Sequence, residues 1–202
     1  MKKIMFNDRY GLTQAVIEGR KTMTRRIEFN SDLQQMVTDS DSYYYDDGYL
    51  VFATQDVDIH YVKTRYKVGE VVAVAQSYRD VCAGGFEPDA TILRLFEEQR
   101  IAGWTNKMFT KAELMPYQIR ITGIKCERLY DISEADCLKE GVRVEFVRND
   151  VPRYYYLDFK RQIKVWFDTP REAFASLIDR VSGLGTWQRN PWVVVYEFEL
   201  VK

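Results

Sequence analysis

The chain has 202 residues and a mass of 23.9 kDa, which predicts one domain, or one domain that carries large insertions. Hydrophobic residues make up 46% of it and charged residues 29%, values that are typical of globular proteins and exclude disordered and fibrous classes. The 29 Lys and Arg against 30 Asp and Glu give a formal net charge of -1. Because a molecule-wide basic field is absent, duplex DNA is not an expected partner, and any nucleic-acid contact must come from a local patch.

Cysteine and histidine usage excludes several kinds of site. The three cysteines, Cys82, Cys126 and Cys137, form no CxxC pair, so neither a disulfide framework nor a structural zinc site is expected. His60 is the one histidine, which excludes two-histidine metal sites and Ser-His triads built from this chain. We therefore predict no metal, no cofactor and a cytoplasmic location. The first residues lack the apolar run of a signal peptide, and no stretch approaches ~18 apolar residues, so no membrane contact is predicted.

The first predicted element is a helix over about residues 9–18. Asp8 can cap its start, and Gly19 can end it in the left-handed conformation. A basic segment follows, and residues 28–47 are then polar and rich in Asp and Ser, which indicates an insertion or a long hairpin. Residues 48–54 and the apolar run 71–75 are predicted strands, the second of them buried.

The second half of the chain has clearer signals. Residues 118–129 predict a long strand, in which Gly123 can form a bulge. Ser133 begins a short helix that ends near Gly141. Thr169, followed by Pro and then Glu at the third helical position, predicts a capping box and a helix that stops at Gly183.

The order of these elements predicts the fold class. Residues 192–201 alternate like a half-buried terminal strand. Because five or six strands and about three helices do not alternate strictly, we predict an α+β fold with a mainly antiparallel, barrel-like sheet. The whole of 1–202 is then one domain, with insertions near 28–60, 80–110 and 142–167.

The basic segment 19–26 is the strongest functional signal. It holds four positive charges in eight residues, a density that predicts an anion site in a chain of net charge -1. Arginine can hold phosphate with two parallel hydrogen bonds, and lysine and threonine can bond its oxygens. The alternative is a solvated basic loop that pairs with nearby acids such as Glu28.

Four motifs in chain order resemble the ASCH (activating-signal-cointegrator homology) family, a relative of PUA domains. The first is Gly19-x-Lys21-x-x-Thr24-x-Arg26, which resembles the family signature. The others are the segments 66–71, 128–136 with Glu140-Gly141 after it, and 190–198. The resemblance implies a small PUA-like β-barrel with helices closing one end and a cleft that binds a nucleoside or single-stranded RNA.

The threonine form of the signature is similar to small bacterial ASCH amidohydrolases, which remove acetate from cytidine acetylated on its exocyclic amine. Carried over by motif, this resemblance implies that Lys21, Thr24 and Glu140 are catalytic. A threonine hydroxyl is a poor nucleophile until a base takes its proton, and without histidine a lysine of lowered pKa can be that base. Glu140 can orient Lys21 or pass a proton to the leaving amine. Alternatively, Glu140 activates water and Thr24 positions it.

Each of these residues also has a plain structural interpretation. Lys21 can be a phosphate contact, Thr24 an ordinary strand residue, and Glu140 the end of a short helix. A carboxylate at a helix C-terminus opposes the helix dipole, which hints at another role for Glu140.

Other residues are predicted to hold the ligand. Asn106 and Lys107, next to Trp104, suit a stacked base. Longer relatives often read VRETW after the barrel turn, where this chain has Gln76 and Ser77 in the sequence VAQSY. The predicted nucleotide- or RNA-binding set is Arg20, Arg25, Arg26, Gln76, Ser77, Asn106, Lys107 and Met115.

Two further functions stay open at this stage. One is a non-catalytic RNA-binding module. The other is a protein-interaction domain that uses the aromatic runs Tyr43–Tyr45 and Tyr154–Tyr156, favoured if both runs are exposed on one face. The catalytic hypothesis requires Lys21, Thr24 and Glu140 to meet in one concave site.

Overall fold

A computed structural model describes residues 1–40, 42–54, 58–84, 90–91, 94 and 102–201. Its centre is a five-stranded sheet in the order β1-β6-β7-β11-β2. The strands are β1 (Lys3–Ile4), β2 (Met23–Arg26), β6 (Val71–Val74), β7 (Gln118–Arg128) and β11 (Trp192–Leu200). The β1–β6 pair is parallel and the other pairs are antiparallel. The α+β prediction is confirmed, while the described strands of this sheet do not close into a barrel.

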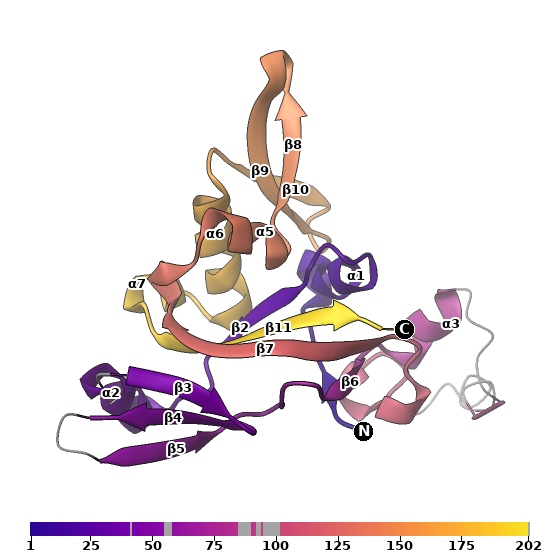
Figure 1. Cartoon of the computed structure of the whole chain (residues 1–202). Helices are drawn as coiled ribbons and strands as arrows, with labels where there is room; N and C mark the ends of the chain where they lie inside the picture. The colour runs from indigo at the N-terminus through magenta and orange to yellow at the C-terminus, as the bar shows by residue number, and fades with distance from the viewer. Residues whose placement is uncertain (41, 55–57, 85–89, 92–93, 95–101, 202) are drawn as a thin grey trace.

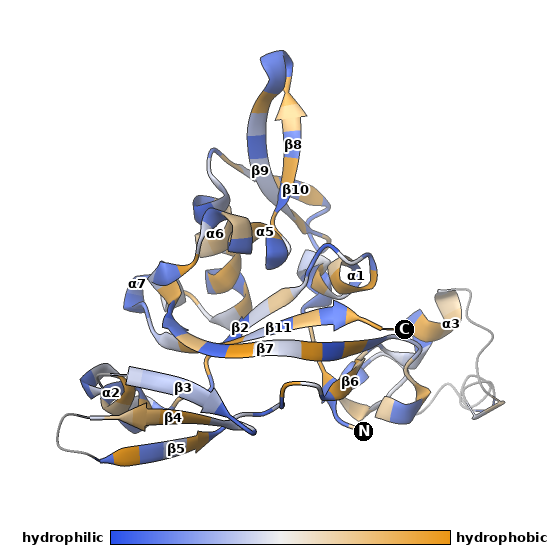
Figure 2. Ribbon diagram, in the orientation of Figure 1, coloured by the Kyte–Doolittle hydropathy of each residue, from blue (hydrophilic) through white to orange (hydrophobic). Residues whose placement is uncertain are grey.

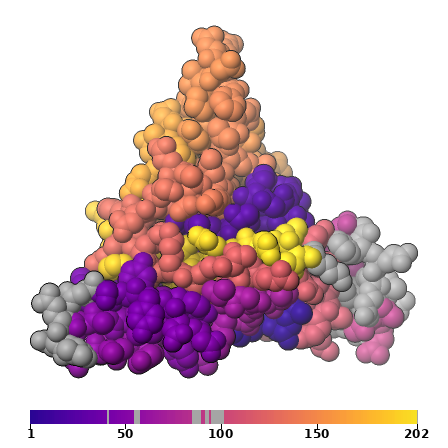
Figure 3. All heavy atoms as spheres, in the orientation of Figure 1, coloured from indigo at the N-terminus to yellow at the C-terminus, as the bar shows by residue number. Residues whose placement is uncertain are grey.

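Two small antiparallel sheets lie outside the central one (Figure 1). The first comprises β3 (Ser42–Asp46), β4 (Tyr49–Ala53) and β5 (Ile59–Lys63), and the second comprises β8 (Arg143–Val147), β9 (Val151–Asp158) and β10 (Ile163–Phe167). Each falls largely in a predicted insertion, which is why the structure has more strands than predicted. The β8–β9 hairpin projects from the body of the molecule (Figure 3). Much of the third predicted insertion, 80–110, lies outside the described residues.

The last strand is more buried than its alternation predicted. β11 lies between β7 and β2, and Val193, Val194, Val195 and Tyr196 are all buried. The half-buried prediction is wrong because consecutive residues of a strand point to opposite faces, so burial of all four means that both faces of this inner strand are covered. The pairing with β7 shifts register where Glu197 faces Gly123, which agrees with the predicted bulge.

The described helices are α1 (Leu12–Ile17), α2 (Ser31–Asp39), α3 (Tyr78–Ala83), α5 (Glu134–Lys139), α6 (Pro170–Ser182) and α7 (Thr186–Arg189). Short 3₁₀ turns at Asp8–Tyr10, Lys107–Phe109, Ala112–Leu114, Leu129–Asp131 and Arg148–Asp150 complete the secondary structure. None of the described helices is long and apolar enough to cross a membrane.

The first predicted helix is broken into two pieces. Gly11, with φ +67°, separates the 3₁₀ turn from α1, and a Cβ there would lie 2.9 Å from the Phe159 ring. The cap is Asn7, whose side chain accepts from the Arg9 amide, so the predicted Asp8 cap is wrong. Gly19 has φ +70°, as the helix-end prediction requires.

The N-termini of α5 and α6, in the second half of the chain, are capped as predicted. Thr169 and Glu172 form the complete capping box of α6, and the Ser133 side chain caps α5 by accepting from the Asp136 amide.

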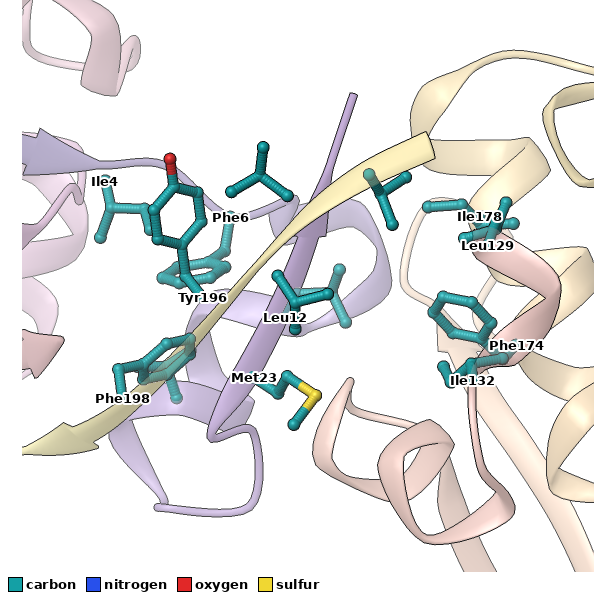
Figure 4. Close-up of a cluster of buried hydrophobic side chains, with 14 of the residues drawn as sticks. Ile4, Phe6, Leu12, Met23, Leu129, Ile132, Phe174, Ile178, Tyr196 and Phe198 are labelled. Carbon is teal, nitrogen blue, oxygen red and sulfur yellow. The ribbon is translucent and has the colours of Figure 1, made fainter. Parts of the chain in front are cut away.

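One large cluster of buried side chains joins the central sheet to α1, α5 and α6 (Figure 4). Met23 on β2 and Phe174 on α6 both belong to it. Hydrophilic and hydrophobic residues alternate along the first part of β7, where Ile119 and Ile121 are buried, as expected for a strand with one covered face (Figure 2).

Candidate functional site

A cleft of about 590 Å³ lies between β2, the segment that leads into α1, and α6. This volume is within the range of small-molecule sites. Its lining residues are Met5, Phe6, Asn7, Leu12, Lys21, Thr24, Arg25, Arg26, Ile27, Glu140, Phe174, Leu177, Ile178, Val181, Ser182 and Arg189. All three predicted catalytic residues are therefore in one concave site, together with two of the three predicted arginines.

Lys21 lies in the turn between α1 and β2 and is 2% exposed. Its Nζ donates to the main-chain oxygens of Met23 at 2.7 Å and Glu140 at 2.8 Å, and to Glu140 Oε2 at 2.6 Å. An ammonium group has three N–H donors and no acceptor, so these three contacts use all its capacity. The arrangement is that of a charged lysine in a buried ion pair.

Glu140 is held in place by the end of α5. It is the C-terminal cap of that helix, and Gly141 after it has φ +108°. A Cβ at Gly141 would lie 2.9 Å from Leu12 Cδ2, so the tight turn that brings Glu140 to Lys21 needs glycine for both backbone and space. A carboxylate at a helix C-terminus opposes the helix dipole, and the structure shows what offsets this cost. Glu140 forms ion pairs with two cations, Lys21 and Arg25.

Arg25 has a fully buried side chain with an accessibility of 0%. Its guanidinium bonds Glu127 at 2.8 Å, Glu140 at 3.1 Å and Asp136 at 3.2 Å. It therefore cannot hold a phosphate without leaving buried carboxylates unpaired, which is costly. The prediction that Arg25 binds nucleic acid does not fit this geometry, because three distant acids occupy its donors.

Burial lowers the pKa of Lys21 below its ordinary value of 10.5. The Glu140 carboxylate offsets part of this shift in the pKa, while Arg26 and Arg25 add to it. A buried lysine with these neighbours can give up a proton more readily than one in water.

Thr24 is buried on β2 and lines the cleft, but its hydroxyl makes no hydrogen bond to any side chain or main-chain group among the described residues. Lys21 and Glu140 bond each other rather than Thr24. If Lys21 passes a proton to Glu140, the lone pair that forms points at Glu140. Lys21 must therefore rearrange before it can take the Thr24 proton directly.

Arg26 has the opposite environment to Arg25. Its Nη2 donates to the Met5 main-chain oxygen at 2.8 Å, and its guanidinium carbon lies 5.9 Å from the centroid of the Phe6 ring. Its Nε is buried without a hydrogen-bond partner, and no carboxylate of the described residues pairs with it. Arg26 is the member of the predicted basic segment that retains free donor capacity in the cleft.

The other predicted ligand-binding residues lie away from this cleft. Arg20 pairs with Glu18 at the surface. Gln76 lines a smaller cavity of about 210 Å³, where its Oε1 is buried and unpartnered. Ser77 caps α3 by accepting from the Asp80 amide.

Three further predicted residues have structural contacts. Asn106 caps the turn at Lys107–Phe109. Lys107 donates to the Phe6 main chain and to Asp8. Met115 is buried, and its sulfur accepts from the Gln76 amide. These residues are not brought to the cleft because their side chains are engaged in local caps and packing.

Sequence reasoning missed two parts of the site. One is the apolar wall of α6, whose i, i+3, i+4 spacing is typical of any buried helix face; its members are Phe174, Leu177, Ile178 and Val181. The other is Arg189, which α7 brings to the cleft. No local signal marks Arg189, because its place depends on how α7 folds back after Gly183.

Within the described part of the chain, no three His, Cys, Asp or Glu side chains are grouped so that they could hold a metal ion. Comparison of the chain with family models, with curated proteins and with solved structures finds no match. The resemblance to ASCH proteins therefore rests on the sequence motifs and stays a prediction.

Proposed function

We propose that this chain is an ASCH-type, PUA-like domain whose cleft binds a nucleoside, free or in single-stranded RNA, and hydrolyses the amide of an acylated cytosine. One observation carries the proposal. Lys21 and Glu140, which are 119 residues apart in sequence, form a 2.6 Å ion pair in a cleft that Thr24 also lines. The α6 wall supplies the apolar surface against which a flat heterocycle can pack.

The chemistry starts from the ion pair. Proton transfer from Lys21 to Glu140 Oε2 gives a neutral amine beside a carboxylic acid, and the burial that lowers the pKa of Lys21 makes the release of this proton easier. The amine, once it turns from Glu140, accepts the proton of the attacking oxygen, and protonated Glu140 donates to the amine that leaves. The carbon–nitrogen bond breaks, a carbon–oxygen bond forms, and water is the net reactant, so acetate and cytidine are the products.

The attacking oxygen has two candidates. In one route it is the Thr24 hydroxyl, which forms an ester that water then hydrolyses. In the other it is a water that Thr24 positions. The unpartnered Thr24 hydroxyl supports both routes equally, since in each it is the cleft's free hydroxyl that meets the substrate.

The test is turnover of N4-acetylcytidine by the purified chain, followed as cytidine and acetate. Lys21→Met keeps an unbranched side chain, one heavy atom shorter than lysine, but removes the amine, and we expect it to lower turnover by at least ~100-fold. Lys67→Met, on the exposed surface, is the matched control and is expected to leave turnover unchanged. No turnover by the wild type, or equal turnover by Lys21→Met, would overturn the catalytic half of the proposal.

A non-catalytic cleft that binds a nucleoside is the second candidate. It is favoured by the saturated bonding of Lys21, whose three donors already have acceptors. Under this candidate, cytidine and N4-acetylcytidine bind with similar affinity and neither is changed.

A further inference from the structure

Two guanidinium groups in the cleft have no carboxylate partner. Arg26 comes from β2 and Arg189 from α7, and both line the cleft. Among the described residues, every ion pair at the cleft involves Lys21 or Arg25 instead. The cleft therefore carries two guanidinium groups without a carboxylate at ion-pair distance, beside a network in which the cations are paired.

One N–H donor of the Arg26 guanidinium has no acceptor. Its Nε is buried and has no hydrogen-bond partner, although Nη2 is anchored on the Met5 main chain. Buried charged donors without a partner are rare and costly, because burial removes the water that would otherwise bond them. A ligand that brings an anionic oxygen to Arg26 would remove this cost.

Arg189 is held at the rim of the same cleft. It is exposed, with Nη2 donating to Thr186 Oγ1 at 3.0 Å and Nη1 to the Leu184 main chain at 3.4 Å. These contacts orient the guanidinium by bonds to neutral acceptors, so its charge is not cancelled. Arg26 and Arg189 thus bring two guanidinium groups from separate elements to one cleft, and neither is in an ion pair with a described residue.

We infer that the cleft takes a phosphate-bearing ligand, in which phosphate oxygens bond Arg26 and Arg189. Guanidinium groups match phosphate geometry with two parallel hydrogen bonds, and a doubly charged phosphate balances both arginines. The cleft volume of about 590 Å³ leaves room for more than the phosphate. That the remainder is a nucleoside packed on α6 rests on the proposed function; the anion site itself does not.

The experiment is calorimetric titration of the full chain with four probes: cytidine, cytidine 5′-monophosphate, inorganic phosphate and a short single-stranded oligocytidine. We expect the monophosphate to bind about 10- to 100-fold more tightly than cytidine, the range expected for hydrogen bonds to charged groups. Tighter binding of the oligonucleotide than of the monophosphate would assign the phosphate to an RNA strand, and the reverse order would assign it to a free nucleotide.

Arg26→Gln and Arg189→Gln should each reduce monophosphate affinity toward that of cytidine, and added salt should act in the same direction. Arg189→Gln changes an exposed side chain, so it tests the inference even if Arg26→Gln impairs folding. Arg20→Gln lies in the same basic segment but outside the cleft, and it should change nothing.

Equal affinity for cytidine and its monophosphate, or binding of no probe, would overturn the inference. So would equal losses from Arg20→Gln and Arg189→Gln. Failure of the proposed function has a different signature: the monophosphate binds in an arginine-dependent way, but N4-acetylated cytidine or its monophosphate is not hydrolysed.

Discussion

The two halves of the cleft use charge in opposite ways. In the closed half, Lys21, Arg25 and Glu140 satisfy one another. In the open half, Thr24 and Arg26 keep polar groups without protein partners. Strand alternation explains the split, because Arg25 shares the face of Met23, whereas Thr24 and Arg26 share the other face of β2.

This difference separates what holds the site together from what meets a ligand. Charges that are buried and paired act on stability, since breaking such a pair leaves an uncompensated charge in a low-dielectric site. Polar groups in the cleft that lack a protein partner do not stabilise the fold, and a buried one costs free energy, so their presence favours a role in binding. The two halves should therefore respond to substitution in different assays.

The largest expected effect is on the closed half. Glu140→Ala leaves Lys21 and the Nη1 of Arg25 without their shared carboxylate, and we expect the free energy of unfolding to fall by about 3–5 kcal/mol. Urea denaturation measures the loss. Glu134→Ala, at the exposed start of the same helix, should cost about 1 kcal/mol or less. Equal losses in the two variants would contradict the division into halves.

A smaller effect concerns pH. Because burial lowers the pKa of Lys21, the unfolded chain binds more protons than the folded one between the lowered pKa and 10.5. The stability that Lys21 contributes is therefore fully present above pH 10.5. It is lost as the pH falls through the pKa that Lys21 has in the folded state. We expect the wild type to gain stability relative to Lys21→Met as pH rises across this window, measured by urea denaturation at several alkaline pH values. A difference that does not change with pH would count against a lowered pKa.

Features set by a few neighbouring residues could be predicted from the sequence. The capping box of Thr169 and Glu172 and the left-handed Gly19 each depend on local backbone bonding, and both are present. The trio Lys21, Thr24 and Glu140 came from motifs and does line one cleft. Its internal bonding could not be predicted, since Glu140 bonds Lys21 and Arg25 but not Thr24.

Features set by distant partners could not be predicted. Arg25 and Arg26 are adjacent in a basic segment, yet the Arg25 guanidinium donates hydrogen bonds to acidic residues that are more than 100 residues away in sequence. The burial of the two tyrosine runs likewise depends on distant partners. Tyr44 on β3 is 56% exposed, whereas Tyr156 on β9 is 2% exposed and packs against Tyr10. The two runs thus do not form one exposed face, so the condition that would favour the protein-interaction function is not met.

The smallest effect on stability is expected in the open half. Thr24→Val replaces the cleft-lining hydroxyl, which has no hydrogen-bond partner among the described residues, with a methyl group of similar size, so we expect the free energy of unfolding to change by less than about 1 kcal/mol. Thr22→Val, in the turn before β2, is the matched control for a threonine outside the cleft.

Turnover of N4-acetylcytidine then distinguishes the two roles of Thr24. If its hydroxyl is the nucleophile, Thr24→Val abolishes turnover and Thr24→Ser, which keeps a hydroxyl, restores part of it. If the hydroxyl only positions water, Thr24→Val retains a measurable fraction of the rate, because Lys21 and Glu140 can still activate and protonate. A large loss of stability in Thr24→Val would instead place the hydroxyl in the closed half, and the comparison between the two halves would fail at that residue.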